Sequence, residues 1–280
     1  MQYAVHHIRR PGLTRDLPYG PEDLFWVSNA ATLVMGEQDA VLIDTFVTAE
    51  QNQQLIDWVR SFGRRLTHVY VTHGHGDHFF GLGQIAQAFP GVRAVGTDAT
   101  VAGAEAQVTP DKLTSFWQRL FPGQIPDRLT VPEPLGDDHL ELEGQRLDIV
   151  ETGFTDTAGS TIVWVPALRL IAAGDVAYND THPYLAESTT ATRREWAATL
   201  DRLGELDPAA VVAAHKNPDR PDDPRILAET AAYLREFNQL DADTTTAEEL
   251  YRAMLDRHPR RINPGSLWSA AQRAKQPALR

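Results

Sequence analysis

Three histidines and one aspartate lie within six consecutive residues, in the segment His73-Gly74-His75-Gly76-Asp77-His78. Imidazole nitrogens and carboxylate oxygens are protein ligands that zinc, iron and manganese accept. The apolar run at 69–72 comes directly before the segment and predicts a strand. Because side chains alternate along an extended chain, His73 and His75 are expected to point one way while Asp77 and His78 reach another. The segment therefore predicts a metal site that can serve two neighbouring ions.

The pattern HxHxDH at residues 73–78, preceded by a predicted strand that ends at Asp44, resembles the motif of the metallo-β-lactamase superfamily of metal-dependent hydrolases. Two later residues fit the order of the same family, and both are expected at strand ends. Asp175 follows a long apolar run and resembles the family's metal-bridging carboxylate. His215 also follows an apolar run and resembles the family's last histidine. The resemblance extends from Leu24 to His215.

One ligand of the family pattern is missing. The family supplies a further histidine from a GHT motif, and the matching stretch here runs from Gly153 to Ser160. In one register Phe154 stands at the position of that histidine; in the other, Asp156 stands there. A carboxylate can ligate zinc at about 2.0 to 2.2 Å, whereas a phenyl ring has no donor atom. The third imidazole is therefore absent in either register, and Asp156 is the alternative ligand.

The resemblance implies two unequal metal sites joined by a shared carboxylate. The predicted ligands of the first ion are His73, His75 and Asp156. Those of the second ion are Asp77, His78 and His215, and Asp175 is the predicted bridge between the two ions. Asp77 is also the candidate catalytic residue, because it can orient the attacking water. We therefore expect one firmly bound ion, zinc before iron or manganese, and a second ion whose binding depends on Asp156.

The segment beyond the predicted bridging aspartate holds three candidates for contact with a substrate. Tyr178 and Tyr184 carry phenolic hydroxyls, which can donate or accept a hydrogen bond. His182 lies between them in a polar stretch and is expected to reach the same pocket. The alternative is ordinary packing for the tyrosines and a surface position for the histidine.

The elements that must position these residues form two similar halves. Strand-like and helix-like spacing of apolar residues predicts, in the first half, strands at 24–35, 40–43, 69–72 and 92–95, and helices at 48–62, 79–89 and towards 120. After a proline-rich loop at 121–134, the second half has strands at 140–142, 147–150, 161–165, 168–172 and 209–213, and a helix at 194–206. This order predicts an α/β fold, a four-layer αββα sandwich with helices outside two facing sheets.

We expect residues 1–220 to form the αββα domain and residues 221–280 to form a helical extension that packs on it and carries no chemistry. The net charge of -12 argues against a nucleic-acid partner, since such proteins concentrate Lys and Arg to displace counterions. No cysteine occurs, which excludes thiolate ligands. No export signal or membrane-spanning run is recognisable, so we expect a cytoplasmic protein with a small-molecule substrate and no membrane partner. The oligomeric state stays open.

The leading hypothesis is hydrolysis of an ester-like carbonyl, a lactone or thioester first, by metal-bound hydroxide. A bound metal lowers the pKa of water from about 15.7 to about 7. Hydrolysis of β-lactams ranks lower, because those enzymes act outside the cytoplasm. Two rivals are an iron-dependent oxygenase or oxidoreductase, which needs only two histidines and a carboxylate, and a catalytically reduced metal-binding module in which Phe154 closes the first site.

Overall fold

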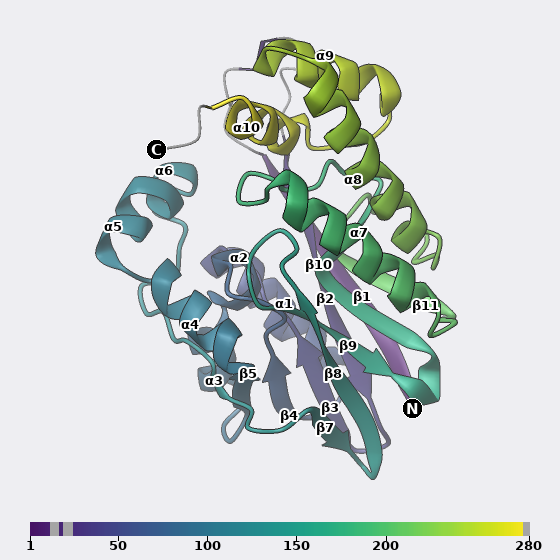
Figure 1. The fold of residues 1–280 in the computed structure, drawn as a ribbon. Helices are drawn as coiled ribbons and strands as arrows, with labels where there is room; N and C mark the ends of the chain where they lie inside the picture. Colours follow the sequence, from purple (N-terminus) through teal and green to yellow (C-terminus); the bar gives the residue numbers. More distant parts are fainter. Residues whose placement is uncertain (12–16, 19–24, 277–280) are drawn as a thin grey trace.

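The computed structural model describes residues 1–11, 17–18 and 25–276, and their strands form one curled sheet (Figure 1). Its strands are β1 (Gln2–Pro11), β2 (Phe25–Met35), β3 (Asp39–Ile43), β4 (Arg65–Tyr70), β5 (Arg93–Gly96), β6 (Glu133–Pro134), β7 (His139–Leu142), β8 (Gln145–Gly153), β9 (Ser160–Val165), β10 (Leu170–Asn179) and β11 (Ala210–Lys216). Their order in the sheet is β6-β5-β4-β3-β2-β11-β10-β9-β8-β7, and β1 pairs with β2.

Helices cover both outer faces of the sheet. They are α1 (Ala49–Ser61), α2 (Gly76–Phe79), α3 (Leu82–Ala88), α4 (Asp98–Gln107), α5 (Pro110–Lys112), the π-helix η1 (Leu113–Trp117), α6 (Gln118–Leu120), the 3-10 helix η2 (Pro166–Leu168), α7 (Thr190–Gly204), α8 (Ile226–Asp243), α9 (Ala247–Arg257) and α10 (Pro264–Ala274). Across the described residues, none of the helices has the length and apolar character needed to span a bilayer.

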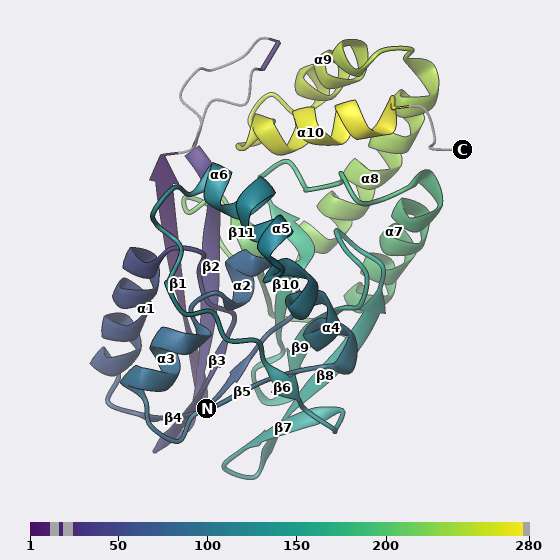
Figure 2. The same ribbon diagram turned by 90° about the vertical axis from the view of Figure 1, so that its left-hand side faces the viewer.

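Three separate hydrophobic clusters show the layers. The middle cluster joins Val41 and Tyr70 of the first half to Leu147 and Val212 of the second, so the two halves of the sheet face each other. A second cluster lies between β2–β4 and helices α1 and α3, and a third lies between β9–β11 and helices α7 to α10. Figure 2 shows the resulting order of helices, sheet, sheet and helices. The predicted αββα sandwich is confirmed. Each of the three clusters lies between two neighbouring layers, so the fold has four layers.

The two halves of the sheet are hydrogen-bonded into one sheet at a narrow seam. Strand β11 pairs with β2 through one residue pair, His215 with Asn29. The predicted pair of sheets is therefore one sheet that bends at this seam. Both residues of the pair belong to the site described below.

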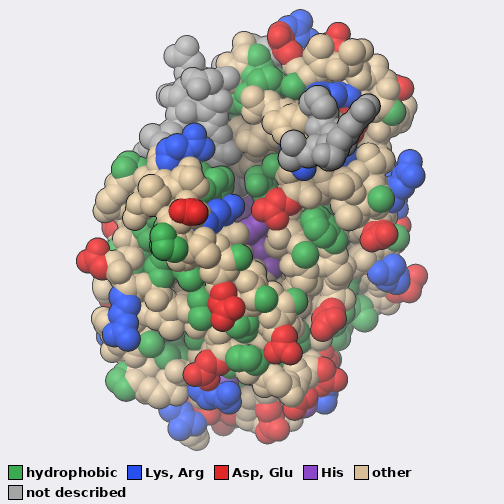
Figure 3. All heavy atoms as spheres, turned by 60° about the vertical axis from the view of Figure 1, so that its left-hand side comes forward, with side chains coloured by type: hydrophobic (Ala, Val, Ile, Leu, Met, Phe, Trp, Pro, Cys, Tyr) green, Lys and Arg blue, Asp and Glu red, His purple; other side chains and the backbone are tan. Residues whose placement is uncertain are grey.

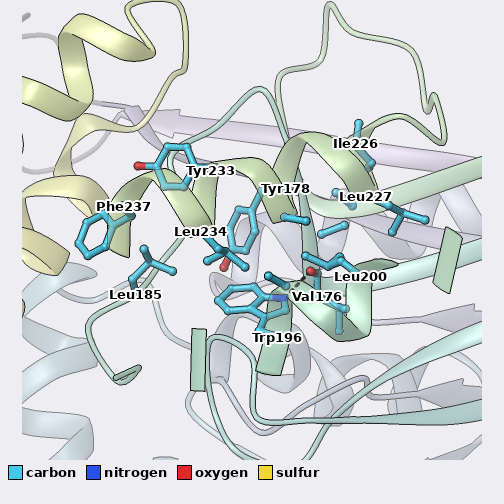
Figure 4. Close-up of a cluster of buried hydrophobic side chains, with 14 of the residues drawn as sticks. Val176, Tyr178, Leu185, Trp196, Leu200, Ile226, Leu227, Tyr233, Leu234 and Phe237 are labelled. Atoms are coloured by element: carbon cyan, nitrogen blue, oxygen red, sulfur yellow. Dashed lines mark hydrogen bonds between the residues drawn. The ribbon is translucent and has the colours of Figure 1, made fainter. Parts of the chain in front are cut away.

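The C-terminal helices share a core with the second half of the sheet (Figure 4). Leu234 and Phe237 of α8 lie in the same buried cluster as Trp196 of α7 and Tyr178 of β10. The indole nitrogen of Trp196 donates a hydrogen bond of 2.8 Å to the carbonyl oxygen of Val176. The predicted helical character of the tail is confirmed, whereas the domain boundary at residue 220 stays a prediction.

Four elements differ from the sequence-based expectation. Strand β6 lies at the end of the proline-rich stretch at 121–134, which was expected to be a loop. The apolar pattern does not predict strand β1. Strand β10 continues to Asn179 rather than ending near residue 172, so Asp175 lies inside a strand and not at its end. Its pairing with β11 shifts on both sides of Gly174, whose φ is +51°. The predicted helix at 79–89 is broken into α2 and α3 at Gly81, where a Cβ would lie 2.1 Å from Oδ1 of Asn52.

Candidate metal centre

The four clustered ligand candidates lie on the connection between β4 and α2. His73 and His75 follow β4, and Asp77 and His78 lie in the single turn of α2. The loop packs directly on α4, because a Cβ on Gly74 would lie 2.6 Å from the backbone of Gly103. Glycine at position 74 therefore permits the close approach that fixes the two histidines.

The first group of ligand atoms contains Asp156. Its Oδ2 lies 2.9 Å from Nδ1 of His75 and 3.4 Å from Nε2 of His73. Its Oδ1 accepts hydrogen bonds from the hydroxyls of Thr155 at 2.9 Å and Ser160 at 3.4 Å. These bonds hold the carboxylate so that Oδ2 faces the two imidazoles, and the three residues form a possible metal-binding group.

The position of Asp156 bears on the choice between the two sequence registers. Phe154 is half-buried in the turn after β8 and has no ligand atom, whereas Asp156 is buried beside His73 and His75. The geometry therefore favours the register that places Asp156, and not Phe154, where the family's third histidine would stand. Whether Asp156 ligates an ion stays a prediction.

The second group combines residues from both halves of the sheet. Nε2 of His215 lies 3.0 Å from Oδ2 of Asp175 and 3.6 Å from Oδ2 of Asp77. Nε2 of His78 lies 3.3 Å from Oδ1 of Asp175. Asp77, His78 and His215 form one possible metal-binding group, and Asp175 forms another with His78 and His73. Asp175 thus lies between the two predicted sites, as a bridging carboxylate must.

The buried polar atoms of the site face one another and indicate that the site is built for cations. Nε2 of His78 and Oδ1 of Asp175, which lie 3.3 Å apart, make no hydrogen bond with any described residue, and Oδ2 of Asp156 faces His73 and His75. A buried polar atom is costly unless it is hydrogen-bonded or bound to a metal. Nitrogen and oxygen atoms converging in groups of three match the ligands of zinc, iron or manganese. The residues present therefore fit divalent ions.

Further polar side chains hold the ligand candidates in place. Asp44, whose φ is +64°, accepts hydrogen bonds from the backbone N–H and the hydroxyl of Thr72, and its Oδ2 lies 3.0 Å from Nδ1 of His78. Asn29 donates to Oδ2 of Asp77 at 3.1 Å. Such bonds fix the ring orientation and tautomer of a metal-binding histidine. The sequence analysis identified Asp44 only as the end of a strand. It did not identify Asn29, for which the only indication in the sequence is a position within a predicted strand.

Glu187 is a further residue that the sequence did not identify. Its Oε1 lies 3.2 Å from Nε2 of His75, and its Oε2 accepts a hydrogen bond from Thr157 at 2.8 Å. The two nitrogens of His75 therefore face two carboxylates, because Nδ1 faces Asp156. A histidine with one nitrogen on a metal and the other on a carboxylate is a common arrangement.

Charge pairing controls protonation of the site. Burial lowers the pKa of His78, but Asp175, Asp77 and Asp44 outweigh this effect and raise the pKa to about 10. Burial likewise opposes ionisation of Asp175, yet His215 and His78 hold its pKa below the usual range. The carboxylates are therefore ionised at neutral pH, and they favour positive charge at the site.

The ligand groups open into a cavity of about 240 Å³. Figure 3 shows histidine side chains at the bottom of a hollow with basic and acidic side chains around it. Tyr178 and Tyr184, the predicted substrate contacts, both line this cavity. Asn263, Ser266 and Ser269 also line it, although the sequence analysis assigned the tail no chemistry. The hydroxyl of Tyr178 donates to Oδ2 of Asp175 at 2.9 Å.

The third predicted substrate contact, His182, lies elsewhere. It is completely buried, and Nδ1 lies 2.9 Å from the hydroxyl of Tyr233 on α8. It is not among the described residues that line the cavity. After the end of β10, Thr181 pairs with Ile262 and the backbone N–H of His182 donates to the carbonyl of Ile262, which places His182 beside the tail helices. Its contact with a substrate stays a prediction.

The buried His182 predicts a loss of stability in mild acid. Burial, followed by nearby Arg261 and His258, lowers its pKa well below the usual value. Below about pH 6.5 the unfolded chain binds a proton at this histidine that the folded protein does not, so stability falls by up to about 1.4 kcal/mol per pH unit. We expect the difference in Tm between the wild type and His182→Asn to shrink or reverse from pH 7 to pH 5. Parallel profiles in thermal unfolding would contradict this.

Comparisons with known proteins agree with this geometry. A family model described as the metallo-β-lactamase superfamily matches residues 24–215. A metallo-β-lactamase from Pontibacter korlensis has a TM-score of 0.63 at 18% identity, covering 83% of this chain and 94% of its own. A metallo-β-lactamase family protein from Thermus thermophilus has a TM-score of 0.65 at 21% identity, covering 95% and 90%. These structures show the shared fold. No protein with a curated description matches the chain.

Proposed function

The chain belongs to the metallo-β-lactamase superfamily, and we propose that it is a metal-dependent hydrolase of an ester-like carbonyl, a lactone or thioester first. One observation carries the proposal: buried groups of histidine and aspartate converge at a cavity that a small molecule can enter. Family membership supports hydrolase-like chemistry with a metal. The narrower substrate class is our inference from the cavity and the ligand set.

We propose that the first ion is held by His73, His75 and Asp156 and that Asp175 is shared with a second ion. Asp77, His78 and His215 complete the second set. When bound, the ions would polarise the carbonyl and lower the pKa of water towards neutrality. Zinc fits these nitrogen and oxygen donors, as do iron and manganese.

The protein side chains would position the reactants. Asp77 is held by Asn29 and kept ionised because the neighbouring histidines outweigh the effect of burial on its pKa, so it can accept a hydrogen bond from an attacking water. Tyr178 stays protonated, since burial and then Asp175 raise the pKa of its phenol well above the usual value. Its hydroxyl bonds Asp175 and so fixes the shared carboxylate.

The cavity favours a small acyl compound. Phe116, Trp117 and Tyr184 supply apolar surface, and Gln107 and Ser266 supply polar groups. A volume of about 240 Å³ suits a lactone ring or the acyl part of a thioester better than a polymer. We propose a small-molecule substrate on this basis.

One observation favours a second candidate function. His73, His75 and Asp156 are two histidines and one carboxylate, which is the ligand set of non-haem iron oxygenases. In that case a single iron ion would be bound, and oxygen would be consumed. The second group, with three further ligand candidates, speaks for the hydrolase.

Elemental analysis of protein purified without added metal, combined with a substrate screen, tests the proposal. We expect zinc, or a mixture containing zinc, and hydrolysis of at least one lactone, thioester or aryl ester. A β-lactam is included because two of the similar structures bear the name metallo-β-lactamase. Iron with substrate-dependent oxygen uptake would support the oxygenase. Bound zinc without turnover of any of these compounds would contradict the hydrolase and favour a metal-binding module.

A further inference from the structure

The cavity contains one lysine whose ammonium has no carboxylate partner among the described residues. Of the three lysines in the chain, Lys216 pairs with Asp222, and Lys275 pairs with Asp241. Lys112 lines the cavity and has no carboxylate partner among the described residues. In a chain of net charge -12, carboxylates outnumber basic side chains, so a basic side chain without a carboxylate partner is unusual. An ammonium at the wall of a binding cavity, without a carboxylate partner in the described part of the chain, is therefore a candidate for ligand recognition.

The segment that carries Lys112 is held rigidly. The ammonium lies 4.6 Å from the ring centre of Phe116, one helical turn later, a cation–π contact. The neighbouring Trp117 is 3% exposed, and its indole nitrogen donates to Gln107 at 2.8 Å. Its ring packs against Phe80, with ring centres 5.1 Å apart. The lysine thus projects from a fixed support.

Helix α10 supplies a hydroxyl to the same cavity. Ser266 is 7% exposed, and its oxygen accepts a hydrogen bond of 2.6 Å from Asn263. A serine hydroxyl has one hydrogen and two lone pairs, so this contact leaves the hydrogen available to a ligand. Ser269 differs, because its hydroxyl already donates to the carbonyl of Gly265 at 3.1 Å. Figures 1 and 2 both place α10 beside the segment of α5 and α6.

The other charges in the cavity have partners. Asp77 and Asp175 belong to the ligand groups, and Glu187 is engaged by His75 and Thr157. Lys112 is the only Lys or Arg among the described lining residues. An anionic group of a ligand would therefore meet one positive charge outside the metal-ligand groups.

We propose that Lys112 and Ser266 bind a negatively charged group of the substrate, a carboxylate or a phosphate, separate from the carbonyl that is hydrolysed. The inference rests on the proposed function and narrows its substrate class to anionic lactones, esters or thioesters. It also gives the C-terminal extension a role in specificity, because Ser266 lies outside the family match at 24–215.

Two esters of equal length test the inference: mono-p-nitrophenyl adipate, which ends in a carboxylate, and p-nitrophenyl hexanoate, which is neutral. In Lys112→Met we expect kcat/KM for the adipate ester to fall about tenfold, mainly through KM, with little change for the hexanoate ester. Ser266→Ala should show a smaller loss with the same preference. A third ester that ends in a phosphate distinguishes the two kinds of anion. The group that the site binds is the one whose ester loses more kcat/KM in Lys112→Met.

Arg119→Met is the matched control, because it removes the same charge from an exposed position seven residues further on. This control should leave kcat/KM unchanged for both esters. Equal losses for both esters in Lys112→Met, or no loss, would overturn the inference. If the wild type hydrolyses neither ester nor any other compound of the screen, the proposed function fails; calorimetric binding of adipate and of neutral hexanamide then decides. Weaker binding of adipate alone in Lys112→Met would still support the anion site, and equal binding would overturn it.

Discussion

The His78→Ala variant is expected to lose the more tightly bound ion and to lose at least about 10³-fold in kcat/KM on the best substrate. His78 belongs to the group that is complete in the sequence pattern, and its Nε2 is buried without a hydrogen bond among the described residues. Removing the ring also takes one partner away from each of Asp44 and Asp175. Metal content by elemental analysis and initial rates measure the two effects.

A folding defect must be separated from a metal defect, because unpaired buried carboxylates destabilise a protein. His78→Gln keeps most of the volume, and its circular dichroism spectrum shows whether the fold survives. His7→Ala is the matched control, since His7 is exposed on β1 and belongs to none of the possible metal-binding groups found among the described residues. It should retain full metal content and activity. A folded His78→Gln with unchanged metal content would refute the assignment of this ligand group.

Asp156→Asn is expected to bind the ion of the first site about a hundredfold more weakly or worse, because a ligand is lost. The amide can still accept hydrogen bonds from Thr155 and Ser160, so the turn should keep its shape. Asp156→His should keep both ions, since it restores the third imidazole of the family pattern. Titration with zinc against a competing chelator gives both affinities.

Phe154→His serves as the control on the same turn. If Asp156 is the resident ligand, this variant should not change the number of bound ions. A rise in stoichiometry in Phe154→His, with no effect of Asp156→Asn, would show that the other register is correct. The two variants thus give opposite answers for the two registers.

The ligand cluster could be predicted because it is local in the sequence. His73 to His78 follow an apolar strand directly, and that context alone places them at one edge of a sheet. The sequence leaves two registers open for Asp156, because a turn of small polar residues fixes no alignment. Only the tertiary structure brings it beside His75, at 2.9 Å.

The layers of the fold were predictable from apolar spacing, but strand β1 was not. On the face of β1 where Ala4 and Ile8 pack against the core, the position between them is His6, whose ring stacks on Trp58 at 5.1 Å, and this histidine interrupts the apolar pattern. Glu187 lies in a turn, Lys112 in α5 and Ser266 in α10, and they meet in the cavity through packing that no local pattern encodes. The buried position of His182 could not be predicted, because it depends on the pairing of Thr181 with Ile262 and on contact with Tyr233, both far away in the sequence.

The narrow seam between β2 and β11 has a consequence for the integrity of the molecule. His73, His75, Asp77 and His78 belong to one half of the sheet, whereas Asp156, Asp175 and His215 belong to the other. Neither half contains a complete set of the predicted ligands. Each bound ion would therefore link the two halves across the bend, and removal of metal would weaken the contact between them as well as abolish metal-dependent chemistry. The same ions would thus support both the reaction and the association of the two halves.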